Sequence, residues 1–528
     1  MFSMLKLPPC LLPIRLNQFK LGILVVLLFM SDHANPLMAS DPRPNQSEES
    51  DVLALGTRRE LFVDDALIAR LDNATLRLHE PVKSGVAVKI DRPWEGPGNF
   101  GAAVIQHDDR YLLYYRGMTL APGDDLGQIC IAVSDDGLNW DKPALARDAR
   151  SGRTDANLVI DATGQRFKGS VWQDNRPGIP EDERIKAMRG APISGEAHTA
   201  FKDPKGPKRL ELLVSADGLV FRPLDESRQP TFVSDLPNSF DGGNTMFWSE
   251  AEQRYVLYYR IMTETGQRTM ARTTSTDLRT WADPIPMTYG DTPPQQFYVN
   301  NTTPYFRAPH IYIALAARFM EGRSAITDEQ AKAIDLKSPR GIIYNQDCSD
   351  GVLLTTRPGS TEYQRTFMEA LIRPGPGDSN WVSRTNYPMT GIHPYDAHRM
   401  MFFVNRNYLQ DSWHIERLLM RIDGFASVNA GYAGGTITTV PFTYTGDHLE
   451  LNFSTSGAGE IRVELQDAEG NPLPGFSMDD CDSLIGDRID GAVSWHGQKS
   501  VSRYIGKTVR LKFQMRDADI YSFAFPAP

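Results

Sequence analysis

One unit recurs five times along the chain, and this repeat limits the fold more than any other feature. Each copy contains a run of aromatic and aliphatic residues with an arginine near its end, preceded by a short apolar stretch and followed by a second apolar run. Such residues suit the pleated, buried surface of a β-sheet. The five aromatic and aliphatic runs are Arg110–Gly117, Glu183–Gly190, Arg254–Ile261, His310–Phe319 and His398–Asn407.

The turn that follows the second run is clearest in the first copy. There, Asp135-Asp136-Gly137 supplies residues that tolerate the backbone angles of a sharp reversal, and Trp140 follows to cover the turn. Looser versions end the second and third copies, in Leu212–Phe221 and Ala271–Trp281. The strands are therefore joined by tight turns within each copy.

Five units of three or four strands, with a period of about seventy residues, predict a five-bladed β-propeller. One small sheet cannot bury both of its faces, whereas five sheets packed radially can, and the ring leaves only short edges. The alternative is a set of unrelated hairpins in a sandwich. We expect Leu61–Asp65 to pair into a blade and close the ring.

The length of 528 residues exceeds what one compact core can hold, so several domains are expected. After Phe425 the repeat gives way to alternating strand-like runs separated by Gly-rich turns, which predict a two-sheet sandwich. Little helix is expected, with Asp328–Ala333 as the best candidate. The predicted organisation is a signal peptide at 1–40, a disordered linker at 41–55, the propeller at 56–428 and the β-sandwich at 429–528.

The first forty residues have the pattern of a secretory signal. Lys6, Arg15 and Lys20 precede the apolar run Leu21–Met30, and small residues follow it. This run is short for a membrane span, and no other stretch is long and apolar enough for one. We therefore expect a secreted or periplasmic protein without a span after signal removal; an uncleaved signal anchor is the alternative.

Charge and cysteine content exclude several classes of protein. The net charge is −10 and no long Lys/Arg run occurs, so a nucleic-acid partner is not expected. The cysteines Cys10, Cys130, Cys348 and Cys481 are too few and too scattered for a disulfide scaffold, although one bridge remains open. No Cys or His spacing indicates a metal site, so we expect neither metal nor cofactor. The oligomeric state is left open.

The mouth of the ring is the expected site. In a propeller, the inner strands begin at one opening of the central cavity and the second strands end there, so polar residues at these positions should converge. Amides and carboxylates hydrogen-bond sugar hydroxyl groups, and an indole stacks on sugar C–H surfaces. Taken singly, each is better explained by turn chemistry. The residues at these positions include Asp91, Trp94, Glu95, Asn99, Trp172, Asp174, Asn175, Asp241, Asn244, Asn300, Asn301, Arg307, Trp381, Arg384 and Asn386.

An arginine recurs at the end of the second strand in all five units. These residues are Arg116, Arg189, Arg260, Arg318 and Arg406. One explanation is structural pairing with carboxylates of neighbouring blades. The other is that some of them face the cavity and bind an anionic substrate through the fork geometry of the guanidinium group.

The five units, the turns such as SDDGLNW and the trailing sandwich resemble the five-bladed-propeller glycoside hydrolases, the superfamily of arabinanases, β-xylosidases and invertases. RELFVDDALI, SFDGGNTMFW, TTPYFRAPHIYIALAARF, NWVSRTNYP and DGFASVNAGYAGGTITTVPF are similar to secreted bacterial proteins described only as glycosyl-hydrolase-like. In the superfamily, three carboxylates line the cavity as nucleophile or base, general acid and orienting group, which suits glycoside cleavage. The Asp-Pro-Asn, Arg-Asp-Pro and Glu-Cys signatures of the invertase branch are absent.

This resemblance and the positions along the chain suggest roles. Asp241, next to a Gly-Gly pair that lets a ligand approach closely, would be the base or nucleophile. Glu95 and Asp174 compete for the role of acid, and Glu369 is a further candidate for it. The residues expected to bind substrate are Trp94, Asn99, Asn244, Asn300, Arg307, Arg384, Asn386, Arg116 and Arg260, of which Arg307 and Arg384 would orient it.

Three functions fit these observations: a secreted hydrolase of a polysaccharide or oligosaccharide, including an anionic one; a carbohydrate-binding propeller that cleaves nothing; and a protein-interaction scaffold with an exposed apolar face. Geometry separates the first two. Two carboxyl groups about 5–5.5 or 6.5–9.5 Å apart across the cavity would support hydrolysis, whereas scattered carboxylates, each neutralised by an arginine, would support binding.

Overall fold

The computed structural model describes residues 52–98, 102–118, 128–145, 154–164, 167, 169–190, 208–227 and 231–527. The predicted signal and most of the predicted linker lie outside these residues. Within them the chain is almost entirely strand, and its one α-helix, α1 (Asp328–Ala333), lies where it was expected and is capped by Thr327 and Gln330. Short 3₁₀ turns lie at Glu181–Glu183, Pro339–Gly341, Asp378–Asn380 and Ser502–Tyr504. No helix in the described ranges is long and apolar enough to cross a membrane.

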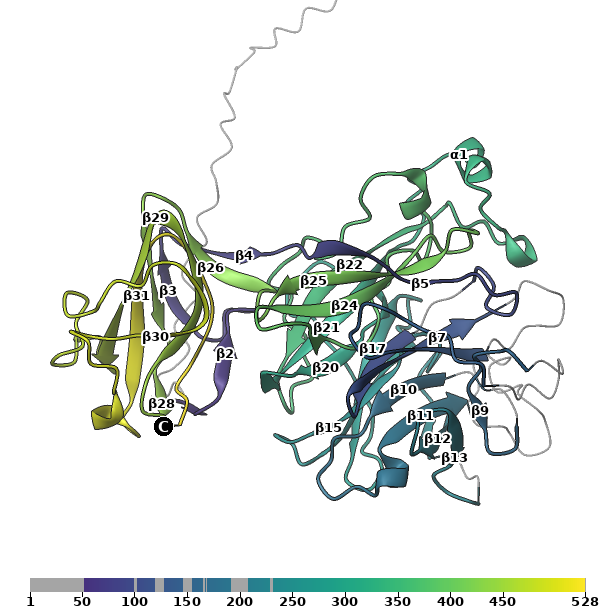
Figure 1. Ribbon diagram of the computed structural model, residues 1–528, viewed down its shortest axis with the longest axis horizontal. Coiled ribbons are helices and arrows are strands. Elements are labelled where there is room, and N and C mark those ends of the chain that lie inside the picture. The colour runs from purple at the N-terminus through teal and green to yellow at the C-terminus, as the bar shows by residue number, and fades with distance from the viewer. Residues whose placement is uncertain are drawn as a thin grey trace, which may run out of the picture. The chain divides into compact units, whose positions relative to one another are not determined.

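Five small sheets follow one another along the chain as the blades of a propeller (Figure 1), which confirms the predicted fold class. Blade one contains β6 (Ala102–His107), β7 (Arg110–Gly117) and β8 (Gln128–Ser134). Blade two contains β9 (Ile160–Asp161), β10 (Gly169–Gln173), β11 (Ile185–Gly190), β12 (Lys208–Ser215), β13 (Val220–Pro223) and β14 (Phe232–Ser234). Blade three contains β15 (Thr245–Ser249), β16 (Arg254–Met262), β17 (Arg268–Ser275) and β18 (Ile285–Pro286). Blade four contains β19 (Gln296–Val299), β20 (Thr302–Tyr305), β21 (Ala308–Met320) and β22 (Cys348–Thr356). Blade five contains β23 (His393–Pro394), β24 (Arg399–Arg406), β25 (His414–Arg421) and β5 (Val82–Lys89).

A hydrophobic cluster fills each space between neighbouring blades. Successive side chains of a strand point to opposite faces, so one strand serves two clusters. In β7, Leu112 packs with Ile185 of blade two, whereas Leu113 packs with Phe403 of blade five. The contact between Leu113 and the last blade shows that the five sheets form a closed ring. The aromatic and aliphatic runs of the repeat are thus buried on both faces.

The ring is closed by β5, which pairs antiparallel with β25. The expectation that Leu61–Asp65 closes it is wrong, because β2 (Arg59–Leu61) pairs with a C-terminal strand instead. Most residues of β5 are exposed or half-buried, since an outer edge strand covers little core. Its polar, glycine-containing sequence therefore lacked the hydrophobic pattern of the other strands.

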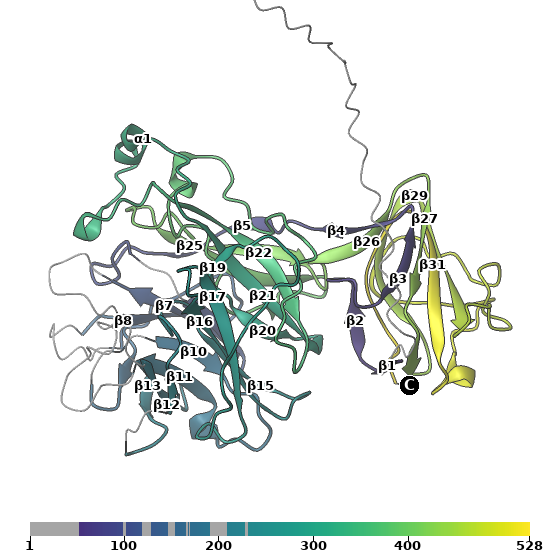
Figure 2. The same cartoon turned by 180° about the vertical axis from the view of Figure 1, so that it is seen from behind.

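The second domain is a ten-stranded sheet built from both ends of the chain (Figures 1 and 2). Its N-terminal strands lie within residues 53–78. The predicted boundary at residue 56 assigns these strands, except for most of β1, to the propeller. They pair instead with the ten-stranded sheet. Their labels and bounds, with those of the C-terminal strands, are β1 (Leu53–Gly56), β2, β3 (Ile68–Asp72), β4 (Thr75–Leu78), β26 (Ala426–Ala430), β27 (Gly435–Thr439), β28 (Phe442–Tyr444), β29 (Glu450–Asp467), β30 (Asp487–Ala492) and β31 (Val509–Ala524).

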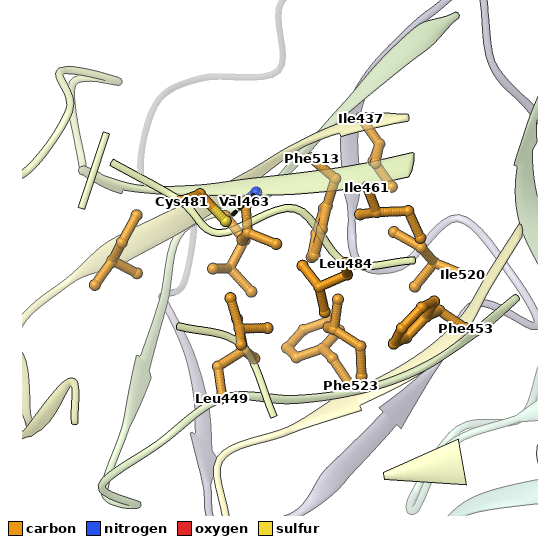
Figure 3. Close-up of a cluster of buried hydrophobic side chains, with 14 of the residues drawn as sticks. Ile437, Leu449, Phe453, Ile461, Val463, Cys481, Leu484, Phe513, Ile520 and Phe523 are labelled. Atoms are coloured by element: carbon orange, nitrogen blue, oxygen red, sulfur yellow. Dashed lines mark hydrogen bonds between the residues drawn. The ribbon is translucent and has the colours of Figure 1, made fainter. Parts of the chain in front are cut away.

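The two layers expected of a sandwich are two halves of one bent sheet. β29 and β31 pair along most of their length, and their register shifts between Thr455 and Glu460. Figure 3 shows side chains from both halves, including Ile461 and Phe513 on one side and Phe453 and Phe523 on the other, pointing into one cluster. The sequence pattern divides β29 and β31 each into two separate runs, but each is one continuous strand.

Two smaller expectations can now be settled. The turn after β8 forms as predicted: Asp136 accepts hydrogen bonds from the backbone N–H groups of Leu138 and Asn139, and the Trp140 indole donates to the Gly137 carbonyl oxygen. The same side-chain bonds recur at Asp217 and Asp277. The described cysteines, Cys130, Cys348 and Cys481, are all buried free thiols, so no bridge forms among them.

Candidate functional site

A cavity of about 590 Å³ lies along the hub of the propeller, between the inner strands. Its volume falls within the range of about 300–1,000 Å³ that is usual for small-molecule sites. Every blade contributes to its wall. The contributing segments are 102–106 of blade one, 169–173 of blade two, 243–248 of blade three, 303–306 of blade four and 390–394 of blade five.

The cavity has two chemically different ends. The inner strands run in the same direction, as the parallel bridges Ala103–Thr390 and Gly243–Val299 show. We call the end where they begin the start end and the other the finish end. Polar residues of the wall at the start end are Arg116, Asn244, Asn301 and Thr390. Exposed residues of the wall at the finish end include Gln106, Asp108, Asn175, Glu250 and Phe306.

Two neighbouring inner strands carry unpaired polar atoms. Trp172 Nε1 and Gln173 Oε1 on β10 and Trp248 Nε1 on β15 are buried and have no hydrogen-bond partner in the part of the chain that the structure describes. All three residues line the cavity. A buried polar atom without a partner costs about 1–3 kcal/mol. These atoms are shielded from the open cavity, so a bound molecule would reach the two donors and the acceptor only after the side chains turn toward it.

Glu95 is fully buried and does not line the cavity. Its carboxylate accepts the backbone N–H groups of Asp91 and Arg92 and the hydroxyl of Tyr115, and Lys142 Nζ lies 2.9 Å away. These contacts organise the loop that leads into blade one. Each of its oxygens already has a partner within the protein.

Asp174 is equally buried. It accepts hydrogen bonds from the Arg176 N–H (3.0 Å) and the Tyr255 hydroxyl (2.9 Å), and it pairs with the buried Lys186 at 2.8 Å. Asp174 also directly follows β10, which places it at the finish end. From the sequence, Asp174 is expected at the start end, because the segment before Asp174 is taken as leading into the inner strand. That segment is the inner strand itself, β10.

Asp241 differs from both. It precedes β15 at the start end, its side chain is 57% exposed, and Arg260 Nη2 donates to its Oδ2 at 2.5 Å. Glu369 is exposed and does not line the cavity. The structure thus does not bring Glu95, Asp174, Asp241 and Glu369 together around one opening. Their catalytic roles stay predictions.

Two of the residues expected to bind substrate, Asn244 and Arg116, line the cavity at the start end. Three others are buried in the framework. Trp94 donates to Asn157, Asn300 accepts from Thr245, and Asn386 bonds the Ser349 and Asn380 carbonyl oxygens. Asn99 lies outside the described residues.

Arg307 follows β20 and therefore lies at the finish end, away from the predicted mouth. It binds Asp423 (2.9 Å) and Asp490 (2.5 Å), so it connects blades four and five with the ten-stranded sheet. Arg384, in contrast, lies at the start end. Its Nη1 donates to the Tyr344 hydroxyl at 3.3 Å, and its guanidinium lies over the rings of Tyr344 and Tyr298.

The five recurring arginines support the structural explanation in most blades. Arg189 pairs with Asp161 and Glu211, Arg318 with Asp350, and Arg406 with Glu416. The partners lie on the same blade rather than on neighbouring blades, because adjacent strands place the side chains opposite each other. Arg260 also pairs within its own blade, with the exposed Asp241, whereas Arg116 lines the cavity and is the exception.

Sequence reasoning missed the polar groups of the finish end. Asp108 and Glu250 lie in the tight turns that join the first two strands of blades one and three, and Phe306 occupies the same place in blade four. The sequence signal for them was an acidic residue in the turn, Asp108 or Glu250. Acidic residues are common in turns, so this signal did not distinguish a binding site from an ordinary turn. In the described ranges, no group of three or more His, Cys, Asp or Glu side chains could hold a metal ion.

No protein-family model and no curated protein matches this sequence. Solved structures do match. A thermostable family-43 glycoside hydrolase is 13% identical over 67% of this chain and 96% of its own, with a TM-score of 0.38. An N-acetylgalactosamine deacetylase from F. plautii, solved with blood group B trisaccharide, is 11% identical over 66% of this chain and 96% of its own, with a TM-score of 0.42. A β-1,2-mannobiose phosphorylase from Listeria innocua, solved with β-1,2-mannobiose, is 12% identical over 66% and 97%, with a TM-score of 0.40. The chain is a five-bladed propeller by its own sheet topology.

Proposed function

We propose that this protein is a secreted carbohydrate-binding propeller that holds an oligosaccharide in its hub cavity. The observation that carries the proposal is the unpaired set of polar atoms on Trp172, Gln173 and Trp248, all three of which line a cavity of suitable volume. Sugar hydroxyl groups donate and accept hydrogen bonds, so they match two indole N–H donors and an amide oxygen.

Aromatic groups complete this chemistry. Trp248 is half-buried in the wall, and Phe306, 37% exposed, lies at the finish end. Rings in these positions offer faces to the apolar C–H side of a pyranose, while Gln106, Asn175 and Gln173 offer amides to its hydroxyl groups. A wall of this mixed kind is usual for sites that bind small polar ligands.

Binding without cleavage is better supported than hydrolysis by the three carboxylates selected from the sequence. Glycoside cleavage needs one carboxyl group as acid and a second as base or nucleophile, facing the same bond. Glu95 and Asp174 are instead buried against lysines, and Asp241 is paired with Arg260. This is the arrangement that separates a binding propeller from a hydrolase.

Hydrolysis is the second candidate function, and it would use a different pair of carboxyl groups. Asp108 and Glu250 line the cavity from blades one and three, and both are exposed. Neither lies within ion-pair distance of a lysine or arginine in the part of the chain that the structure describes. Acid–base catalysis requires two such carboxyl groups that are exposed to the same cavity.

A glycan array with the purified protein tests binding, and release of reducing ends from each bound glycan tests hydrolysis. Trp248→Phe keeps a ring but removes the indole N–H and should weaken binding about tenfold, the value of one hydrogen bond. Trp281→Phe is the matched control, because Trp281 is also a half-buried tryptophan of blade three but does not line the cavity. Equal effects of both substitutions, or an array without hits, would contradict the proposal.

The hydrolytic candidate has its own test. Asp108→Asn and Glu250→Gln should each abolish release of reducing ends if these carboxyl groups catalyse it, with glycan binding retained. Release that survives both substitutions would remove the pair from consideration. The proposed secretion is checked separately, by the N-terminal sequence of protein recovered outside the cytoplasm, which should begin near residue 41.

A further inference from the structure

Three arginines gather around one tyrosine at the start end of the cavity. Arg260 comes from β16, Arg268 from β17 and Arg384 from the loop before the inner segment of blade five. Their guanidinium carbons lie 4.8, 5.4 and 5.5 Å from the centroid of the Tyr298 ring. Cation–π attraction holds each of them near the ring, although like charges repel one another.

The carboxylates that pair with this cluster are open to solvent. Asp241 binds Arg260 at 2.5 Å with 57% of its side chain exposed, and Glu321 lies 3.3 Å from Arg268 with 59% exposed. The carboxylate end of each pair is therefore open to competition from another anion. The arginines are far less exposed than their partners.

Two guanidinium edges in the cluster are incompletely used. The Nε atoms of Arg260 and Arg268 are buried and have no hydrogen-bond partner in the described ranges. In Arg260, which is 2% exposed, Nη2 binds Asp241 while Nε beside it binds nothing there. The Nε and Nη2 atoms form the edge that grips a carboxylate or sulfate with two parallel hydrogen bonds.

In blade four, the corresponding arginine has both atoms of this edge hydrogen-bonded. Arg318 uses both atoms of this edge on one carboxylate, since Nε donates to Asp350 Oδ1 at 2.9 Å and Nη2 to Oδ2 at 2.5 Å. Arg318 is therefore occupied by its own blade. Arg260 has the same place in the repeat, but the buried Nε half of its fork makes no hydrogen bond in the described ranges.

None of the three arginines lines the cavity, and the cluster lies behind its wall. Gly243 and Asn244, which line the cavity, follow Asp241 after a single residue, and Gly243 bridges to Val299 beside Tyr298. That intervening residue, Gly242, lies so close to the Tyr298 carbonyl oxygen and Arg260 that a Cβ atom there would approach them to 2.8 and 3.0 Å. Glycine thus permits the contact between the loop and the arginines.

We infer that Arg260, Arg268 and Arg384 bind the anionic substituent, a sulfate ester or a carboxylate, of a sugar chain held in the cavity. The inference rests on the proposed carbohydrate binding and adds the class of carbohydrate. The fork of Arg260 and the neighbouring Arg268 supply the hydrogen bonds, and Arg384 closes the site from blade five.

Binding constants for paired glycans test this inference. The probes are κ-carrageenan oligosaccharides with their desulfated forms, and oligogalacturonides with their methyl esters. The wild-type protein should prefer one anionic chain over its neutral counterpart by about tenfold or more. Arg268→Gln and Arg384→Gln should abolish this preference. Arg254→Gln, an exposed arginine at the other end of β16, is the control and should keep the preference.

Equal affinity for charged and neutral chains in both pairs would overturn the inference while leaving carbohydrate binding intact. A preference that survives Arg268→Gln and Arg384→Gln would do the same. If no chain binds, thermal unfolding in sodium sulfate against sodium chloride of equal ionic strength decides. Because sulfate also stabilises proteins non-specifically, the comparison is between the wild type and the variants. Extra stabilisation that both variants lose would keep the anion site and remove the cavity function, and equal stabilisation of all three proteins would remove both.

Discussion

The carboxylates of blades one and two differ from the carboxylate of blade three in what surrounds them. Glu95 and Asp174 are fully buried and each is held by a lysine, a tyrosine hydroxyl and backbone N–H groups. Asp241 is largely exposed, and the hydrogen bond to its side chain comes from Arg260. All three looked alike in the sequence, as acidic residues close to an inner strand.

The difference indicates which acidic residues belong to the framework. Taking a carboxylate out of water is costly, and only a full set of hydrogen bonds and a close cation offsets the cost. Glu95 and Asp174 have that set, so they hold loops in place. Asp241 lacks it, and an exposed ion pair contributes about 0–1 kcal/mol. The Asp241 side chain is therefore not a framework residue of the same kind.

The largest expected effect comes from breaking the buried pair of Asp174. Lys186→Met leaves that carboxylate buried without its cation and should lower the free energy of unfolding by about 3–5 kcal/mol. Chemical denaturation measures the change. The double variant Asp174→Asn with Lys186→Met removes both charges and should lose clearly less. A loss below about 1 kcal/mol in the single variant would place Asp174 among the open carboxylates.

Glu95 should show a smaller effect of the same kind. Glu95→Gln keeps one acceptor oxygen but loses the charge near Lys142, and we expect a loss of about 1–3 kcal/mol in unfolding free energy. Asp91→Asn is the matched control, because Asp91 contacts the same lysine at 2.9 Å but is 62% exposed. If both substitutions cost the same, burial is not what distinguishes these carboxylates.

The sequence was a good guide to the blades because their cores alternate within single strands. The pattern that places Leu112 and Leu113 on opposite faces is local, and it also repeats. The outer strand β5 escaped detection because an edge strand with few buried residues carries no such pattern. β29 was read as two strands because the glycines near its register shift resemble a turn.

The site was harder to predict because its chemistry depends on distant partners. Lys142 is 47 residues from Glu95, and Tyr255 is 81 residues from Asp174. Nothing near these carboxylates in the sequence announces such partners. For Asp241, the adjacent glycines were expected to admit a ligand, whereas the space at Gly242 is filled by Arg260 and the Tyr298 carbonyl oxygen. The local signal therefore indicated a close contact but not its partner.

The pH dependence of stability tests the effect of burial on a residue of the cavity wall, His393. Burial lowers the pKa of His393, although its ring hydrogen-bonds the Val104 carbonyl oxygen, which opposes the shift. The unfolded chain then binds a proton more readily than the folded protein, so stability should fall as pH drops through about 6.5. His393→Gln should flatten this part of the curve of unfolding free energy against pH. His398→Gln, an exposed histidine of the same blade, should leave it unchanged, and equal curves for both variants would contradict the assignment.

Asp241→Asn should have the smallest effect on stability and the most informative effect on binding. Asp241 is 57% exposed and Asn keeps an acceptor oxygen for Arg260, so the unfolding free energy should change by no more than about 1 kcal/mol. If Asp241 shields the arginine cluster, removing its charge frees Arg260 Nη2 beside the unpaired Nε, and anionic glycans should bind more tightly than to the wild-type protein. If Asp241 is instead the base or nucleophile expected from the sequence, the variant should lose release of reducing ends with its affinity for anionic glycans unchanged. Measuring both quantities on one preparation decides between the roles, because charge shielding changes the affinity, whereas catalysis changes the release of reducing ends.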